Sequence, residues 1–354
     1  MTVLQVCAYS AQYGGNFLAS LKALDMELQK QGFRTIYLFP EQAKDKKWCK
    51  DLQRESTVYF ASSNRFGIKT FLQIKKAVKE ADVVHSHFEL YDCLCALARR
   101  KQQKLIWHLH DSFDEKTDWA HRVINWMQYG LLGFNAVLIS PSRYYADYVV
   151  QMGFPSNNVY IVDNCLDCSR LAKDEPQRDI KYDFLVYGGF YEIKGLDVVL
   201  DAARMLAQKG YRFSIGIVGY QKTWTYIDEN YADLENYIIR EEPSENVSQF
   251  YRSARVFISA SRRETFSYAM LEALFMGLPV ICSDIVGTQW AWKYQNSKHF
   301  ESGNVAELTL WMESVLNNQR WVTLQQSKET TKDIEQRYNI KLWTKQIKGI
   351  YLGE

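Results

Sequence analysis

The sequence predicts an α/β protein with two domains, each built around a parallel β-sheet. The chain has 354 residues, which is more than one hydrophobic core usually supports. Short apolar runs alternate with amphipathic helical stretches along most of its length. The order strand, loop, helix, strand is clearest between residues 256 and 284, where Gly277 and Pro279 end a helix just before a second apolar run. This stretch reads as one parallel βαβ unit.

The expected elements follow in chain order. In the first half, strands are expected at 2–9, 35–39, 57–61, 83–87, 104–109, 136–141 and 159–162, and helices at 17–30, 68–82, after 87 up to 100, and 142–152. In the second half, strands are expected at 183–187, 213–218, 237–239, 256–258 and 279–281, and helices at 196–210, 244–254 and from about 265 to 276. An aromatic, acidic stretch at 220–235 reads as an insertion. The remaining chain reads as helical, ending in an amphipathic helix.

The composition excludes several classes of protein. Hydrophobic residues make up 47% and aromatic residues 14% of the chain, so it is not disordered. The formal net charge is only +2, and we expect no nucleic-acid partner. The seven scattered cysteines predict free thiols in a reducing cytosol. No signal peptide and no long apolar segment is evident, so the sequence predicts a cytoplasmic protein.

Two carboxylates, Glu264 and Glu272, lie eight residues apart in the βαβ unit. On one helix this spacing gives a rise of about 12 Å and a difference of about 80° in azimuth. That separation exceeds the roughly 5 to 9.5 Å at which a glycoside hydrolase pair flanks one bond. It suits a ligand with hydroxyl groups at both ends and an anionic middle near the start of the helix. A nucleotide sugar has this layout, whereas solvated glutamates on an ordinary helix are the alternative.

Residues 264–281, ETFSYAMLEALFMGLPVI, resemble the E-x7-E signature of retaining glycosyltransferases of the GT-B class, in the group called family 4. The resemblance implies two Rossmann-like domains that face each other across a cleft. It also implies that Glu264 contacts hydroxyls of the donor sugar and that Glu272 holds the ribose. The backbone just after the first glutamate would approach the diphosphate, at Thr265, Phe266 and Ser267.

Residues 188–195, GGFYEIKG, are similar to the family's G-R-L-x-x-x-K-G loop. The resemblance places Gly188, Gly189 and Lys194 at the donor diphosphate. Gly189 stands where the family has an arginine, so one cation is missing from this pattern. Of the nearby bases, Arg262 or Arg263 could supply that charge, and we include Arg263 among the donor-binding candidates.

Gly14 and Gly15 separate the first strand from the first helix. Glycine lets a backbone approach an anion at a helix N-terminus, although an ordinary strand-to-helix turn is the alternative. The resemblance implies that this loop faces the diphosphate and the acceptor, so both glycines join the donor-binding candidates.

Four of the six histidines, His85, His87, His108 and His110, stand at the carboxyl ends of expected parallel strands, where ligands bind in open α/β sheets. Core packing and a zinc site are the alternatives. Because the chain has no Asp-x-Asp motif, we expect no metal. His110 with Asp111 resembles the family's strand-H-D motif, which implies that His110 sits beside the donor sugar.

The N-terminal half carries an excess of bases: residues 1–165 hold 20 Lys and Arg against 16 Asp and Glu. Trp48 stands among four lysines, a combination that suits an anionic membrane surface. A solvated charged face is the alternative. We therefore expect cytoplasmic protein with peripheral docking at the inner face of the membrane.

The resemblance predicts a domain plan with an acceptor-binding domain at 1–168, a linker at 169–182 and a donor-binding domain at 183–335. The last segment, 336–354, would be a helix that crosses back to the first domain. Residues 164–167, NCLD, resemble the family's N-G-x-D element with Cys165 in place of glycine.

The sequence thus predicts a retaining, metal-independent hexosyltransferase without a cofactor. It would move a sugar from a nucleotide-sugar donor, UDP being the commonest nucleotide, to a glycan or lipid-linked saccharide in cell-surface polysaccharide or glycoconjugate synthesis. His110, Lys194 and Glu264 are the catalytic candidates. The alternatives are a sugar-nucleotide epimerase on the same fold, and a silent subunit that binds a partner glycosyltransferase or a polysaccharide, which the Gly189 departure favours.

Overall fold

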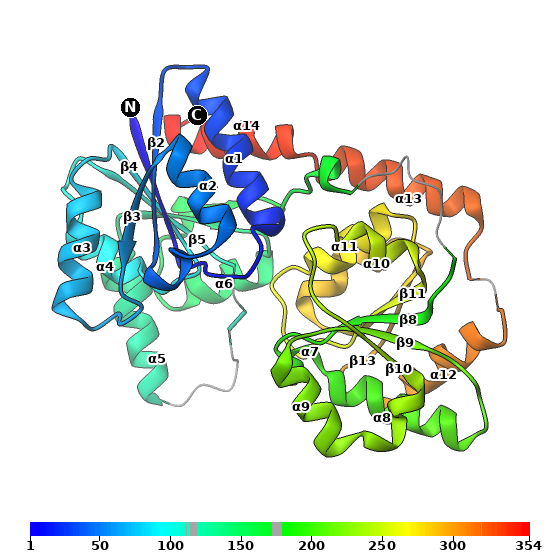
Figure 1. Cartoon of the computed structure of the whole chain (residues 1–354). Helices are drawn as coiled ribbons and strands as arrows, with labels where there is room; N and C mark the ends of the chain where they lie inside the picture. The colour runs from blue at the N-terminus through cyan, green and yellow to red at the C-terminus, as the bar shows by residue number, and fades with distance from the viewer. Residues whose placement is uncertain (111, 114–118, 172–178, 320) are drawn as a thin grey trace. The chain divides into compact units, whose positions relative to one another are not determined.

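The computed structural model describes residues 1–110, 112–113, 119–171, 179–319 and 321–354 (Figure 1). The chain divides into two compact units. The N-terminal unit comprises Met1–Cys165 and Ile340–Glu354, and the C-terminal unit comprises Leu166–Asn339. Asp111 and residues 172–178 of the expected linker lie outside the described residues. The acceptor and donor roles of the two domains stay predictions.

The N-terminal unit contains a parallel sheet of seven strands in the order β3-β2-β1-β4-β5-β6-β7. Its strands are β1 Thr2–Cys7, β2 Arg34–Pro40, β3 Thr57–Ala61, β4 Val83–His87, β5 Lys104–His108, β6 Ala136–Ser140 and β7 Val159–Ile161. The order reverses between β1 and β4, which makes this pair the switch point of a doubly wound sheet. Buried apolar runs such as β2 are typical of strands covered on both faces.

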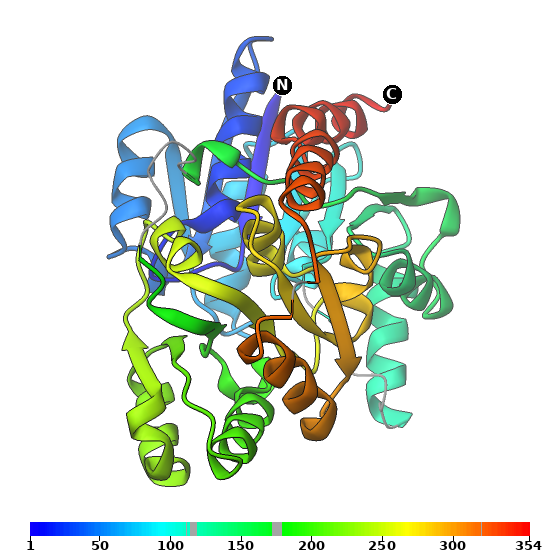
Figure 2. The same ribbon diagram turned by 90° about the vertical axis from the view of Figure 1, so that its right-hand side faces the viewer.

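The helices of the N-terminal unit cover this sheet. They are α1 Gly15–Gln29, α2 Lys47–Glu55, α3 Ile68–Val78, α4 Asp92–Ala98, α5 Trp119–Trp126, α6 Arg143–Gln151 and α14 Ile340–Leu352, with short helical turns at Glu41–Ala43, Met127–Leu132 (η2) and Ser156–Asn158. The last helix, α14, packs beside α1, although more than 300 residues separate them in the sequence (Figures 1 and 2). Ile347 and Tyr351 of α14 join Leu24 and Leu28 of α1 in one hydrophobic core.

The C-terminal unit repeats this plan with six parallel strands in the order β10-β9-β8-β11-β12-β13. The strands are β8 Tyr182–Tyr187, β9 Ile215–Val218, β10 Ile238–Glu241, β11 Ala254–Ser259, β12 Val280–Asp284 and β13 Ser297–Glu301. Its helices are α7 Tyr191–Lys194, α8 Leu196–Gln208, α9 Gln221–Asn230, α10 Ser248–Arg252, α11 Tyr268–Phe275, α12 Val305–Leu316 and α13 Leu324–Arg337, with short helical turns at Cys168–Arg170 (η4), Ala232–Tyr237 (η5) and Val286–Ala291 (η6). The switch point lies between β8 and β11.

Two hydrophobic cores lie on opposite faces of this second sheet. One joins the sheet to α8 and α12, and the other joins it to α10 and α11. The predicted class, α/β with two parallel-sheet domains, is therefore confirmed. All seven cysteines are free thiols, as predicted. Among the residues described, no helix is both long enough and apolar enough to cross a bilayer.

Two predictions about the elements and one about a side chain are wrong. Strand β13 was not expected, because SKHFE lacks an apolar run and lies at the edge of its sheet. The stretch 220–235 is no insertion, since α9 buries Thr223, Trp224 and Ile227 against the core as the crossover between β9 and β10. Trp48 is only 8% exposed and donates from its indole nitrogen to the Ala11 carbonyl at 3.0 Å, so it cannot dock to a membrane.

Candidate functional site

The candidate residues of the C-terminal unit gather at the carboxyl ends of β8 and β11, the two strands of its switch point. The loop after β8 passes through Gly188 and Gly189 into α7, which ends at Lys194. Gly195 follows with φ of +62°, and a Cβ there would lie 2.1 Å from the Ala260 carbonyl oxygen. Only glycine fits this close approach, which holds the Lys194 loop against the end of β11.

Lys194 and Glu264 meet across this switch point. The Lys194 ammonium forms an ion pair and a hydrogen bond with Oε1 of Glu264. Ser261 donates to the same carboxylate oxygen at 3.0 Å. The Glu264 side chain is 14% exposed and the Lys194 side chain 32%, so the pair lies near the surface without being fully solvated. A partly exposed cation at this position can turn toward an anionic ligand.

The segment that follows Glu264 is held by close backbone packing. A Cβ on Gly287 would lie 2.2 Å from the Glu264 carbonyl oxygen, so the turn after β12 packs in direct contact with the backbone at Glu264. The side chains of Thr265, Phe266 and Ser267 are all buried. The Thr265 hydroxyl has no hydrogen-bond partner in the described part of the chain. An unpaired buried hydroxyl beside Glu264 is available to a ligand.

Glu272 lies on α11, which begins at Tyr268, with Ser267 as the N-cap. The Ser267 side chain makes no hydrogen bond to the first turn of this helix. Only residues 268–275 are helical, so the estimated rise of about 12 Å, which assumed one continuous helix, does not apply. The two glutamates have separate sets of partners.

Glu272 is buried, and two side chains from other segments contact its carboxylate. The Tyr251 hydroxyl donates at 2.9 Å, and a guanidinium nitrogen of Arg170 lies 3.5 Å away. Burial raises the pKa of Glu272, while the charge of Arg170 and the hydrogen bond from Tyr251 oppose this effect. Few groups can therefore reach the buried Glu272 carboxylate, and its oxygens can accept hydrogen bonds from those that do.

Arg170 is the residue of this site that the sequence analysis missed, since it falls in the segment expected to be a linker. It ends the short helix η4, where Oδ1 of Asp167 accepts from the Ser169 amide at 3.1 Å. The only signal in the sequence is its place three residues after the NCLD element. Cys165 of that element does not have a positive φ, so the turn forms without glycine.

Gly189 stands where the family has an arginine, and the ring of Tyr220 packs close to its backbone. A Cβ on Gly189 would lie 3.3 Å from the Tyr220 ring. Arg262 is already engaged, because it donates to Asp197 and, at 2.7 Å, to the Glu192 carbonyl. Arg263 is exposed in the same loop and stays a candidate for the missing charge.

In the N-terminal unit, Gly14 and Gly15 lie between β1 and α1, beside its switch point. The Tyr9 hydroxyl donates to the carbonyls of Tyr13 at 2.8 Å and Gly14 at 3.2 Å, which fixes the loop. Gly15 has φ of +58°, a conformation that favours glycine.

A chain of hydrogen bonds runs from His110 into the interior of the N-terminal unit. Nε2 of His110 lies 3.0 Å from Nδ1 of His87, whose Nε2 lies 2.9 Å from Oε1 of Gln5. The Gln5 amide nitrogen donates to the Tyr351 hydroxyl at 2.9 Å, and that hydroxyl lies 2.6 Å from Nδ1 of His85. The last helix, α14, is therefore linked to His110 through three side chains.

Burial keeps these imidazoles uncharged. Desolvation lowers the pKa values of His85, His87 and His110 well below the usual range, and lowers the pKa of His108 to about 3. A neutral His110 can donate from one nitrogen and accept at the other. The structure brings His110 together with His87, and Lys194 together with Glu264, each pair within one unit.

Two family sequence models match this chain. Glycosyltransferase Family 4 matches residues 20–170, and Glycosyl transferases group 1 matches residues 181–318. The chain belongs to the group 1 glycosyltransferases, family 4. The predicted GT-B fold, two Rossmann-like domains, is confirmed.

Relatives and solved structures agree with this assignment. The amylovoran biosynthesis glycosyltransferase AmsK of Erwinia amylovora is 24% identical over 298 residues, covering 72% of this chain and 70% of that protein. The capsular polysaccharide biosynthesis glycosyltransferase CapM of Staphylococcus aureus is 27% identical, covering 39% of this chain and 38% of that protein. Anabaena HepE in complex with UDP-glucose superimposes with a TM-score of 0.82 at 17% identity and full coverage of both chains. The lipopolysaccharide outer core galactosyltransferase WaaB gives 0.68 at 18% identity, covering 100% of this chain and 99% of that chain.

Proposed function

We propose that the protein is a retaining glycosyltransferase that binds a nucleotide-sugar donor in its C-terminal unit. The observation that supports this most is the pairing at the C-terminal switch point. Lys194 and Glu264 meet there, and Glu272 is held by Tyr251 and Arg170. A cation and two separate carboxylates match the diphosphate, sugar and ribose of such a donor. Family membership favours the same conclusion.

Each part of the donor would meet a different group. When the donor binds, the Lys194 ammonium leaves Glu264 and forms an ion pair with the diphosphate, because two phosphates carry more negative charge than one carboxylate. Glu264, released from the lysine, accepts hydrogen bonds from hydroxyls of the sugar. Glu272 accepts from the ribose hydroxyls. The unpaired hydroxyl of Thr265 and the exposed Arg263 are further donors for the phosphates.

Catalysis follows from stabilising the leaving group. As the bond from the anomeric carbon to the diphosphate oxygen breaks, negative charge grows on the diphosphate, and Lys194 stabilises it. The acceptor hydroxyl attacks from the same face and gives its proton to the leaving phosphate, so the configuration at the anomeric carbon is retained. His110 and Glu264 orient the sugar hydroxyls in this proposal. Gly14 and Gly15 of the N-terminal unit stay donor-binding candidates, because glycine lets backbone N–H groups approach an anion.

UDP-sugar is the donor class we propose, because HepE binds UDP-glucose and shares this fold. The acceptor would be a growing glycan or lipid-linked saccharide of a surface polysaccharide, since AmsK and CapM act in amylovoran and capsular polysaccharide biosynthesis.

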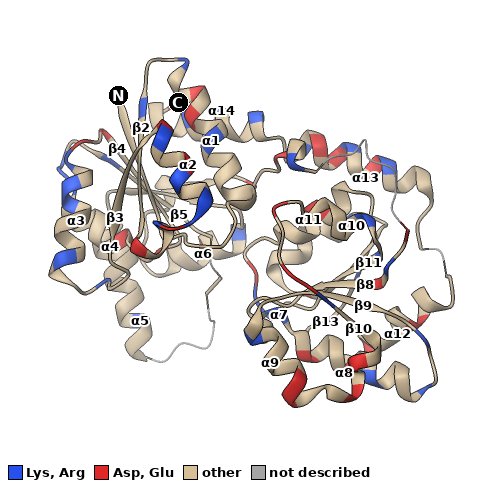
Figure 3. Ribbon diagram, in the orientation of Figure 1, with Lys and Arg blue, Asp and Glu red and all other residues tan. Residues whose placement is uncertain are grey.

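An exposed apolar surface on α5 and η2 favours a lipid-linked acceptor at a membrane. This surface consists of Trp119, Ile124, Trp126, Met127, Leu131 and Phe134, each between 51% and 79% exposed. No residue of α5 is buried. Lysines and arginines on α2 and α3 of the same unit add positive charge (Figure 3). Exposed tryptophans with nearby bases are typical of proteins that bind anionic lipid surfaces.

The donor proposal is tested with a panel of nucleotide sugars without added metal. Thermal shift and nucleotide release would be measured on the wild type and on Glu272→Gln. We expect one donor to stabilise the wild type and release its nucleotide slowly, and the variant to lose both responses at the same donor concentration. A wild type that responds to no donor would overturn the proposal and favour the silent subunit.

The membrane proposal has its own test. Co-sedimentation with vesicles of neutral lipid, and of neutral lipid with 30% anionic lipid, would be compared for wild type and Trp126→Ser. We expect binding to the anionic vesicles and weaker binding of the variant. Trp290→Ser is unsuitable as a control because that ring packs in the C-terminal core, so the exposed Leu310→Ser serves instead. Equal sedimentation of all three proteins would contradict the proposal.

A further inference from the structure

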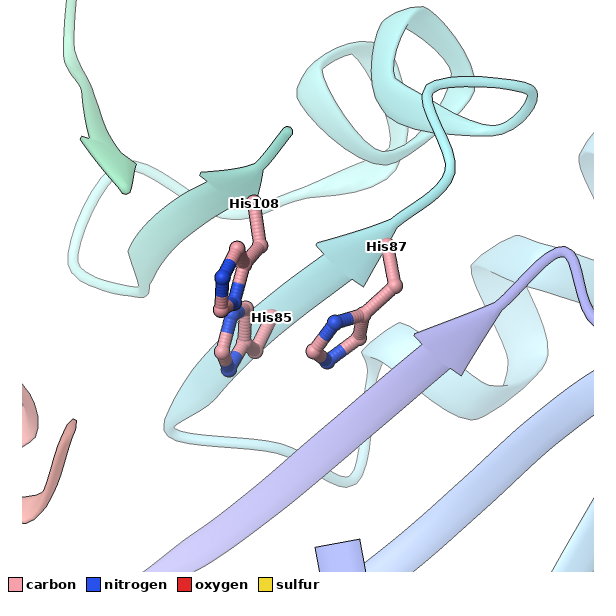
Figure 4. A group of neighbouring side chains, drawn as sticks. All are labelled: His85, His87 and His108. Atoms are coloured by element: carbon pink, nitrogen blue, oxygen red, sulfur yellow. The ribbon is translucent and has the colours of Figure 1, made fainter. Parts of the chain in front are cut away.

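Three histidines of the N-terminal unit converge in its core. His85 and His87 are two residues apart on β4, so their side chains share one face of the sheet. His108 is the neighbour of His87 on the adjacent strand β5. Each side chain is at most 1% exposed. One nitrogen from each ring can be chosen so that all three atoms lie within 4.8 Å of one another (Figure 4).

The hydrogen bonding of this cluster is incomplete. Both nitrogens of His108 and Nε2 of His85 are buried without a hydrogen-bond partner among the described residues. Leaving a buried polar atom unpaired is unfavourable, so three such atoms in one place favour a ligand that contacts them. Figure 4 shows the rings of His85 and His108 standing one above the other, with His87 turned toward them.

One ring nitrogen of His85 and one of His87 contact residues outside the cluster, as is usual for histidines that bind metals. Tyr351 lies 2.6 Å from Nδ1 of His85, and Gln5 lies 2.9 Å from Nε2 of His87. A metal-binding histidine nearly always has its second ring nitrogen fixed by such an outer partner, which sets the orientation of the ring. His85 can therefore offer Nε2, His87 can offer Nδ1, and His108 can offer either nitrogen.

We propose that His85, His87 and His108 form a site for a transition-metal ion of the Zn²⁺ class. Imidazole suits Zn²⁺, and three histidines with one open position for water are an established coordination set. Bond lengths of about 2.0–2.1 Å place tetrahedral ligands about 3.3 Å apart, so the rings close inward when the ion binds. The ion then joins β4 and β5 beneath α14, and stabilises the N-terminal unit.

This site shares His87 with the hydrogen-bond chain to His110. Because Gln5 holds Nε2 of His87, coordination uses Nδ1 and replaces the 3.0 Å contact with His110. His110 is only partly buried, so it can turn to water instead. The metal site is distinct from the donor-binding residues of the C-terminal unit, and it is linked to the proposed donor residues through the contact of His87 with His110.

The test is zinc binding by the full chain after metal removal with a chelator. Bound zinc would be measured by mass spectrometry, and Co²⁺ would be substituted as a spectroscopic probe of the ligands. We expect one ion per chain, a higher melting temperature, and a cobalt spectrum of nitrogen ligation without thiolate bands. His108→Gln and His85→Gln should lose the ion, whereas the exposed His121→Gln of the same unit should keep it.

Two further experiments test the proposal even if the histidine variants fail to fold. Tyr351→Phe removes the outer partner of His85 and the acceptor of the Gln5 amide nitrogen, keeps all three ligands, and should weaken zinc binding about 10–100-fold while the chain stays folded. Crystals of the wild type grown with zinc should show an anomalous peak among the three rings. Water without an anomalous signal at that point, cobalt bands from thiolate, or zinc binding unchanged in the His variants would each overturn the proposal.

Discussion

The N-terminal and C-terminal units repeat one strand order, and both collect polar residues at the switch point, but the groups differ in charge. In the C-terminal unit the groups are ion pairs, Lys194 with Glu264 and Arg170 with Glu272. In the N-terminal unit they are neutral imidazoles joined through Gln5 and Tyr351. The topology therefore fixes where a site forms, and the side chains decide which ligand charge it can accept.

Solvent exposure explains the difference. The Lys194 and Glu264 side chains are 32% and 14% exposed, so water and each other stabilise their charges. The imidazoles of His85, His87 and His108 are at most 1% exposed, so a protonated ring there would lack the hydration that stabilises its charge in water. We therefore expect changes in the C-terminal unit to affect catalysis and donor binding, and changes in the N-terminal network to affect stability.

The largest effect is expected for Lys194→Ala. Removing the cation takes away stabilisation of the developing diphosphate charge, so kcat should fall about 100- to 1000-fold with a smaller change in donor KM. Steady-state kinetics with the donor found in the panel measures this. Lys194→Arg keeps the charge and should retain more activity, and Lys298→Ala is the control on the same unit. A raised KM with unchanged kcat would contradict the catalytic role.

Glu272→Gln should mainly weaken donor binding. Losing a charged acceptor of ribose hydroxyls costs about 1.5–3 kcal/mol, which is a rise in donor KM of about 10- to 100-fold. Because burial raises the pKa of Glu272, lowering the pH should protonate it before an ordinary carboxyl and raise the KM of the wild type. The variant should lack this pH dependence. A KM profile that is the same in both proteins would show that Glu272 does not bind the donor.

Tyr351→Phe tests whether the neutral network is structural. The change leaves the Gln5 amide nitrogen and Nδ1 of His85 without their hydroxyl partner, so the free energy of unfolding should fall by about 1–3 kcal/mol. Urea denaturation measures this, and donor KM should stay as in the wild type. Tyr160→Phe, at an exposed position of the same unit, should leave stability unchanged. A fall in kcat without a fall in stability would instead indicate that the network orients His110.

The smallest effect concerns Asp92, another buried group of the N-terminal unit. Desolvation raises its pKa to about 7, although Ser86 donates to it. Since the unfolded pKa is about 3.9, the folded state keeps the proton longer, and stability is lost as pH rises from about 4 through 7. From pH 6 to pH 7 this loss is about 1 kcal/mol. The free energies of unfolding of Asp92→Asn at pH 6 and pH 7, measured from unfolding curves, should differ by less than those of the wild type. An equal difference in the two proteins would contradict the raised pKa of Asp92.

Much of the fold and part of the site could be predicted from the sequence. Apolar runs such as that of β2 and stop signals such as Gly277 are local, so they indicate strands and helix ends without tertiary information. The loop with Lys194 and the loop with Glu264 each follow a strand, and parallel strands end at one edge of a sheet. Strand β13 was missed because an edge strand needs no apolar run.

The sequence by itself determined two parallel-sheet domains, the family, and the segments that carry Lys194, Glu264 and His110. Only the tertiary structure decided which side chains meet: Gln5 with Tyr351, 346 residues away, and Arg170 with Glu272. It also buried Trp48, which sequence reasoning had placed at a membrane. The physical reason is that backbone preference acts over a few neighbouring residues, whereas burial and ion pairing depend on how distant segments pack.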